Sequence, residues 1–71
     1  MQAREIRTLT TEEIQERLEE GHRRLFALRR ELGTGRLEDH NQIVSAKRDV
    51  ARMKTILRER ELVAELLEEA A

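Results

Sequence analysis

Apolar residues recur with helical spacing along two stretches of the chain, which are separated by a break that contains glycine. Between residues 10 and 33 the spacing alternates between four and three residues, in the series Ile14, Leu18, Gly21, Leu25, Leu28 and Leu32. Thr10 precedes this series and Glu13 follows three residues later, which is the pattern of a helix capping box. We therefore expect a first helix over about 10–33, in which Gly21 permits close approach by a partner helix or another group.

The segment Gly33-Thr34-Gly35 predicts a reversal of the chain, because glycine readily adopts the left-handed conformation that ends a helix. After a turn over 33–38, Asp39 is the candidate N-cap of a second helix over about 39–69. The apolar positions of this second helix are Ile43, Ala46, Val50, Met53, Ile56 and Leu57. With a short helical turn in residues 1–9, the expected fold is all-α: a long antiparallel two-helix hairpin that forms one domain over 1–71.

Composition narrows the class of protein. The chain has 71 residues, no cysteine and no proline, and 41% of its residues are charged, which is typical of long exposed helices. A chain this short encloses little core, so we expect no deep catalytic pocket and no cofactor. No apolar run approaches the roughly 20 residues that span a bilayer, and the expected location is the cytoplasm, without membrane contact.

The side chains that could carry catalysis are few and isolated. His22 and His40 have neither a cysteine nor a suitably spaced acidic partner for a metal ion, and Ser45 has no matched base. A glycine-rich phosphate loop is also missing from the sequence. We therefore predict that the chain is not an enzyme and has no catalytic or metal-binding residues.

Positive charge gathers in one part of the chain. The totals of 14 basic and 15 acidic residues give a net charge of −1, yet residues 45–60 carry six Lys or Arg and two acidic residues. On a helix that turns about 100° per residue, one flank of the apolar stripe carries Lys47, Lys54 and Arg58. Arg48 and Arg52 lie roughly opposite the stripe. Because guanidinium groups bind phosphate in a bidentate manner, we predict that this helix binds a nucleic-acid backbone, with Thr55 as a neutral hydrogen-bond donor. The alternative is a solvated face balanced by helix ion pairs.

Two other segments differ from this basic helix. Phe26 points away from the apolar seam of the first helix, so it is predicted to stack on a base or to fill a partner's pocket, unless it folds over the helix surface. After residue 60 the acidic residues Glu61, Glu65, Glu68 and Glu69 are unopposed by any basic one. This tail should avoid phosphate, and it is either a solvated extension of the second helix or a docking surface for another protein.

The segment Lys47-Arg48-Asp49-Val50-Ala51-Arg52-Met53-Lys54-Thr55 resembles the signature of the bacterial family of large-subunit ribosomal protein twenty-nine (the uL29 family). Further motifs resemble this family in the same order, over residues 1 to about 60: Arg4-Glu5-Ile6-Arg7 with Thr10 and Glu12-Glu13-Ile14, Leu25-Phe26-Ala27-Leu28-Arg29, and Gly35-Arg36-Leu37. The chain departs from the usual pattern in its slight negative charge and in its acidic extension.

This resemblance implies a structural constituent of the large ribosomal subunit that supports translation. It would bind large-subunit rRNA near the polypeptide exit tunnel, as a monomer within the ribosome, beside ribosomal protein twenty-three and where nascent-chain factors dock. By matching positions, the residues that would contact rRNA are Lys47, Arg48, Arg52, Lys54, Thr55 and Arg58, with Arg29 and Arg36 as further contacts. The alternative function is a free coiled-coil adaptor whose apolar seam pairs between chains. DNA binding by the basic helix is disfavoured, because the chain lacks a dimerising zipper directly continuous with the basic region.

Overall fold

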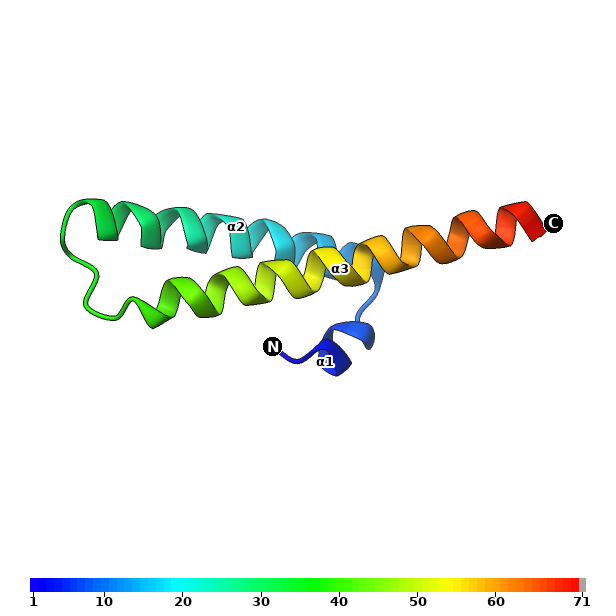
Figure 1. Ribbon diagram of the computed structural model, residues 1–71, viewed down its shortest axis with the longest axis horizontal. Coiled ribbons are helices and arrows are strands. Elements are labelled where there is room, and N and C mark those ends of the chain that lie inside the picture. Colours follow the sequence, from blue (N-terminus) through cyan, green and yellow to red (C-terminus); the bar gives the residue numbers. More distant parts are fainter. Residues whose placement is uncertain (71) are drawn as a thin grey trace.

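Residues 1–70 are described by a computed structural model as three helices, α1 (Ala3–Arg7), α2 (Thr11–Gly33) and α3 (Asn41–Ala70). The two long helices run antiparallel, and α1 lies against α3 on a different side from α2 (Figure 1). The molecule is a rod of 55 × 19 × 16 Å, because the C-terminal part of α3 continues well beyond the start of α2 (Figure 1). Within the described residues there is no strand, and the predicted all-α hairpin with a short N-terminal helical segment is confirmed.

Both long helices begin at side-chain caps. The Thr10 hydroxyl accepts a hydrogen bond of 3.2 Å from the Glu13 amide, as the capping box predicts. The second helix begins at Asn41, two residues later than expected. The Asp39 carboxylate accepts a hydrogen bond of 2.9 Å from the Asn41 amide. Asp39 therefore binds a free amide of the first turn from outside the helix.

The turn after α2 is a Schellman motif. The Arg36 amide donates to the Glu31 carbonyl at 2.8 Å, and the Gly35 amide donates to the Leu32 carbonyl at 3.2 Å. Gly35 has φ of 75°, a conformation that glycine adopts without steric cost. Of the two glycines expected to reverse the chain, Gly35 is thus the one in the left-handed region, and Leu37 follows it into the core.

Two clusters along the rod contain all the buried apolar side chains of the described residues except Val50. The first joins all three helices through four buried side chains: Ile6, Ile14, Met53 and Ile56. The second lies nearer the turn and is formed by Leu25, Leu28, Leu37 and Ala46. A rod this thin has no third helix over most of its length, so these few side chains supply most of the apolar burial that stabilises the fold.

Gly21 lies where α2 packs against α3. A Cβ atom added to it would be 3.1 Å from Val50 Cγ2 and 3.4 Å from Met53 Cε. The first distance is shorter than ordinary van der Waals contact, so the Val50 side chain would have to shift by a few tenths of an ångström to admit a side chain here. The glycine in the seam therefore faces the partner helix of the same chain, which sequence reasoning had left open.

The seam of α2 is used within the hairpin. Ile14, Leu25 and Leu28 are buried against the rest of the chain. Leu32, expected at the end of the seam, is instead 45% exposed, because the chain is already leaving α2 for the turn. Since the seam is buried inside one chain, it is not free to pair between chains as the coiled-coil adaptor requires.

Arg60 holds the N-terminal segment against α3. Its guanidinium donates hydrogen bonds to the Leu9 carbonyl at 2.8 Å, the Arg7 carbonyl at 3.3 Å and the Thr11 hydroxyl at 3.0 Å. This residue was counted among the six cations of residues 45–60, yet its donors are directed at the chain itself. Nothing in the local sequence distinguishes it, because its partners lie about fifty residues away.

Candidate nucleic-acid interface

Three exposed cations of α3 form a row along one side of the hairpin. Lys47, Lys54 and Arg58 all lie about 70–110° around the helix from the direction that faces α2, and the axial steps between them are about 11 Å and 6 Å. All three side chains are exposed. Because α3 is packed against two other helices, this row is held on a rigid support.

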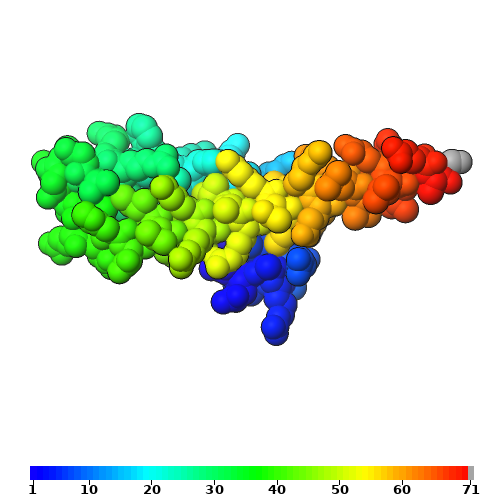
Figure 2. Space-filling view, in the orientation of Figure 1, coloured from blue at the N-terminus to red at the C-terminus, as the bar shows by residue number. Residues whose placement is uncertain are grey.

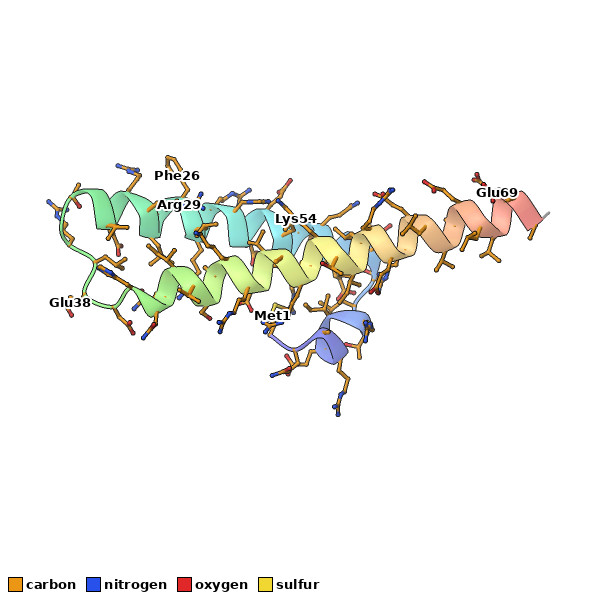
Figure 3. The ribbon with its side chains drawn as sticks, viewed as in Figure 1. Met1, Phe26, Arg29, Glu38, Lys54 and Glu69 are labelled. Atoms are coloured by element: carbon orange, nitrogen blue, oxygen red, sulfur yellow. The ribbon has the colours of Figure 1, made fainter. Side chains whose placement is uncertain are left out.

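The α2 side of the same surface carries Phe26 and Arg29. In an antiparallel pair, residues displaced from the seam in the same rotational sense lie on the same side of the hairpin, and both residues are displaced by about 60–120° in that sense. Figure 3 shows Phe26 projecting from α2 on the side away from α3. We call this surface the basic flank, formed by Arg29 and Phe26 of α2 and by Lys47, Lys54 and Arg58 of α3.

Phe26 is exposed on the basic flank rather than folded into the hairpin. Its residue surface is 64% exposed, and the Arg30 guanidinium carbon lies 5.9 Å from the centre of its ring. This is a cation–π distance. Because Arg30 lies over one face of the ring, the opposite face is the one on which a base would stack.

Arg48 and Arg52 lie on a different side of α3 from the row. Both border an open depression of about 380 Å³ that is also lined by Met1 and Gln2. Arg52 is 3.5 Å from the Asp49 carboxylate, which also accepts a hydrogen bond of 3.0 Å from the N-terminal ammonium group. The structure therefore does not bring all the predicted α3 contacts to one surface, since Arg52 points toward the N-terminal segment.

The predicted contact residues of α3 differ in whether they belong to an ion pair. Arg58 lies 2.9 Å from the Glu61 carboxylate in an exposed pair, whereas the ion pairs among residues 1–70 include none with Lys47, Arg48 or Lys54. Exposed pairs of this kind contribute about 0–1 kcal/mol. Arg58 can therefore exchange its partner for a phosphate at little cost, and the other three carry uncompensated charge.

The Thr55 hydroxyl is not a free donor in this structure. It donates a hydrogen bond of 2.9 Å to the Ala51 carbonyl, one turn earlier in the helix. The expectation of a neutral donor at this position is thus altered, because back-bonding to the helix uses the hydroxyl proton. The oxygen remains able to accept a hydrogen bond.

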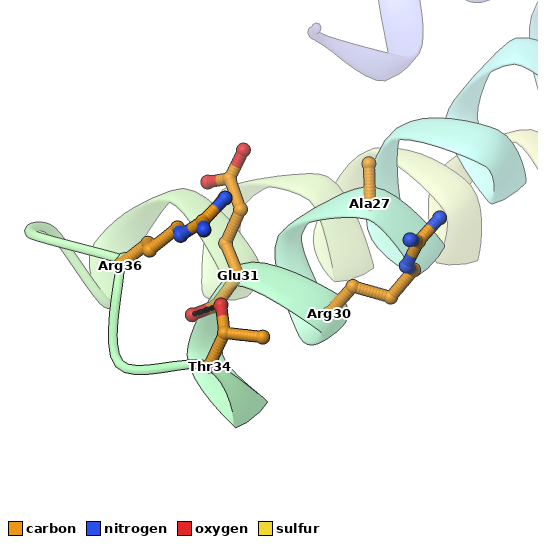
Figure 4. A pocket seen from close by; sticks show the side chains of 5 residues that line it. All are labelled: Ala27, Arg30, Glu31, Thr34 and Arg36. Carbon is orange, nitrogen blue, oxygen red and sulfur yellow. Dashed lines mark hydrogen bonds between the residues drawn. The ribbon is translucent and has the colours of Figure 1, made fainter.

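Arg36 lies at the tip of the hairpin, beside a shallow open pocket of about 240 Å³. The lining residues are Ala27, Arg30, Glu31, Thr34 and Arg36 (Figure 4). The Thr34 hydroxyl donates to the Glu31 carbonyl at 3.1 Å and fixes the backbone of the turn. Arg30 and Arg36 give this tip two cations, which are separated from the row on α3.

Among residues 1–70 no group of three or more His, Cys, Asp or Glu side chains is placed to hold a metal ion. The described helices include none that is both long and apolar enough to cross a membrane.

A thin helical hairpin with exposed cations on one flank is suited to binding the phosphate backbone of a nucleic acid. The model of the family described as Ribosomal L29 protein matches residues 4–60. The chain therefore belongs to the ribosomal L29 protein family, whose members are non-enzymatic structural constituents of the large ribosomal subunit. The family resemblance, the absence of enzymatic function and the cytoplasmic, ribosomal location predicted from the sequence are confirmed by this membership.

Curated relatives agree over nearly the whole chain. The large ribosomal subunit protein uL29 of Geobacillus stearothermophilus is 52% identical over 64 residues, which are 90% of this chain and 97% of the relative. The protein of the same name from Thermosipho melanesiensis is 55% identical over 62 residues, 87% of this chain and 94% of the relative. A third protein of this name, from Staphylococcus aureus strain JH9, is 47% identical over 62 residues, which are 87% of this chain and 90% of the relative.

Proposed function

We propose that this chain stabilises the large ribosomal subunit by binding its rRNA through the basic flank. The observation that carries the proposal is the row of Lys47, Lys54 and Arg58, which is exposed, rigidly supported and located within the segment that matches the family. Arg48, Arg52, Thr55 and Arg36 are further contacts on neighbouring surfaces of the hairpin. Recognition then rests on the shape and the phosphates of folded RNA, because side chains cannot read the deep groove of an A-form duplex.

The proposed position in the subunit follows from the family resemblance. The chain would lie near the polypeptide exit tunnel, beside ribosomal protein twenty-three, with nascent-chain factors docking close by. Chemical crosslinks in intact ribosomes provide the test. Crosslinks between this chain and ribosomal protein twenty-three are the expected result, and crosslinks exclusively to proteins far from the tunnel exit would contradict this position.

Sedimentation of a tagged chain from a cell lysate tests the main proposal. At moderate salt the chain is expected to travel with the large subunit, and raising the salt is expected to release it, because phosphate contacts weaken steeply with ionic strength. The Arg48→Ala, Arg52→Ala double variant is expected to travel less completely. A wild-type chain that stays at the top of the gradient as a discrete oligomer would instead support the coiled-coil adaptor.

Phe26→Ala is expected to weaken binding to large subunits by about 5- to 150-fold, because stacking of one base on an aromatic ring contributes roughly 1–3 kcal/mol. The free energy of unfolding should hardly change, since the ring is 64% exposed. Rebinding of labelled chain to subunits that lack it measures the first quantity, and urea denaturation measures the second.

Leu62→Ala is a matched control for Phe26→Ala, because it also removes a large exposed apolar side chain, 43% exposed, that lies outside the basic flank. It should leave rebinding unchanged. If Phe26→Ala behaved like this control in both measurements, the stacking role of Phe26 would be wrong.

A further inference from the structure

The last ten described residues of α3 form an amphipathic helix that has no partner in the chain. Every residue from 61 to 70 is exposed, and Figure 2 shows this end of α3 projecting beyond α1 and α2. The large apolar side chains here are 43–66% exposed: Leu62, Val63, Leu66 and Leu67. Contiguous exposed apolar surface of this kind marks interaction sites in soluble proteins.

The apolar residues are spaced as anchors for a groove. Val63, Leu66, Leu67 and Ala70 follow the i, i+3, i+4, i+7 pattern by which an amphipathic helix docks into an apolar groove. Their common direction lies on the side of α3 that α1 covers nearer its middle, about 120° from the direction that faces α2. A partner on the tail would therefore continue the layer that α1 begins.

A depression at the base of the tail leads onto this apolar face. Its volume is about 340 Å³ and its lining is Arg7, Ile56, Glu59, Arg60 and Val63. The ion pair between Arg7 and Glu59, 3.7 Å apart, borders it. Val63 thus belongs both to the depression and to the tail, so the apolar surface runs from the packed part of the hairpin onto the projecting helix.

The charge of the tail excludes RNA as its partner. Glu61 and Glu65 lie in nearly the same direction around α3 as Lys54 and Arg58, so the sign of the charge reverses along a single line of the helix. The ion pair between Arg58 and Glu61 lies at this reversal. A phosphate backbone that follows the basic flank must leave it after Arg58, because the next residues on this line are carboxylates.

The same charge argues against a second copy of the chain. Residues 61–70 contain four glutamates and no basic residue, so a second copy of this tail would bring further carboxylates and no cation to pair with them. The carboxylates occupy the part of the helix circumference that the apolar residues leave. The complementary surface is therefore an apolar groove with lysine or arginine at its rim.

We propose that residues 61–70 are a docking helix for another protein, which receives Val63, Leu66, Leu67 and Ala70 in an apolar groove rimmed by basic residues. The family model ends at residue 60, so this surface lies outside the segment that the family model matches. It does not require the rRNA contacts of the basic flank, and either assignment can fail without the other.

The proposal is tested by photocrosslinking in assembled ribosomes. The full chain carries p-benzoylphenylalanine in place of Leu66, and a matched chain carries it in place of Glu65 on the acidic side. The Leu66 probe is expected to crosslink to a protein, at a site that mass spectrometry maps to apolar residues bordered by Lys or Arg. Crosslinks to rRNA, to a second copy of this chain or to no molecule, a mapped site without basic residues, or an equal yield from the Glu65 probe would overturn the proposal.

Two double variants then test the forces involved. Val63→Ser with Leu67→Ser should lower the yield from the Leu66 probe by about tenfold or more, since both anchors lose their apolar contact. Glu68→Gln with Glu69→Gln should lower it severalfold and make it less sensitive to salt. An unchanged yield in either variant would contradict the anchor or charge role assigned here.

Sedimentation of the same chains separates this inference from the proposed function. Both double variants, and a chain that lacks residues 62–71, are expected to travel with the large subunit as the full chain does. If these altered chains no longer travelled with the large subunit while the unaltered chain did, the tail would be required for subunit assembly, and the docking role would be overturned. Failure of the unaltered chain to sediment would instead contradict the proposed rRNA binding.

Discussion

Replacing Lys47 and Lys54 together with alanine is expected to weaken binding to large ribosomal subunits by about 30- to 150-fold at low salt. Each substitution removes one contact between a cation and a phosphate, worth roughly 1–1.5 kcal/mol. Both side chains are exposed and neither belongs to an ion pair among residues 1–70, so no intramolecular contact offsets the loss. Rebinding of labelled chain to subunits that lack it, over a series of salt concentrations, measures the effect.

The salt dependence provides a second quantity in this experiment. Each lost phosphate contact should lower the slope of log affinity against log salt by about 0.7–0.9. Arg17→Ala with Arg24→Ala is the matched control, because it removes the same charge from exposed positions of α2 outside the basic flank. If both double variants lost affinity equally, binding would follow net charge, and the basic flank would not be the binding surface.

Met53→Ala is expected to have the largest effect on the stability of the free chain. Met53 is 2% exposed and packs with Ile6, Ile14 and Ile56 where all three helices meet. Truncation of a buried methionine typically costs about 2–5 kcal/mol through lost contacts and the cavity left behind. Small domains have little stability to lose, so the variant should lose most of its cooperative urea transition, as followed by far-ultraviolet circular dichroism.

Two controls accompany the Met53 experiment. Met53→Leu nearly conserves volume and should cost less than about 1.5 kcal/mol. Leu66→Ala removes a side chain that is 63% exposed and should change stability by no more than about 0.5 kcal/mol. A Met53→Ala chain that unfolds at the same urea concentration as the wild type would show that the three-helix cluster does not stabilise the isolated chain.

Much of the fold follows from local sequence. The alternating spacing from Ile14 to Leu28 predicts the buried stripe of α2, Thr10 predicts its cap, and Gly35 predicts the turn. These features depend on residues a few positions apart, whose relative directions are fixed by helical geometry. The prediction was least accurate at the ends, where Leu32 is exposed and α3 begins later than Asp39 suggested.

The candidate site was predicted less completely than the fold. The concentration of cations in residues 45–60 identifies the segment, but it does not distinguish Arg60, which binds the backbone of Arg7 and Leu9, from Lys54, which is exposed. Nor does it show that the Thr55 hydroxyl donates to Ala51. A wheel drawn for one helix gives directions around its axis, whereas the availability of a side chain depends on what else packs there.

The sequence by itself determined the two long helices, the reversal between them, the basic segment and the acidic tail, because periodicity and charge are properties of neighbouring residues. Only the tertiary structure decided that Gly21 faces α3, that α1 covers one side of α3, and that Phe26 and Arg29 share a flank with Lys54. The physical reason is the distance along the chain. Contacts such as those of Arg60 join residues 49–53 positions apart, and they form when burial of apolar side chains brings separate helices together.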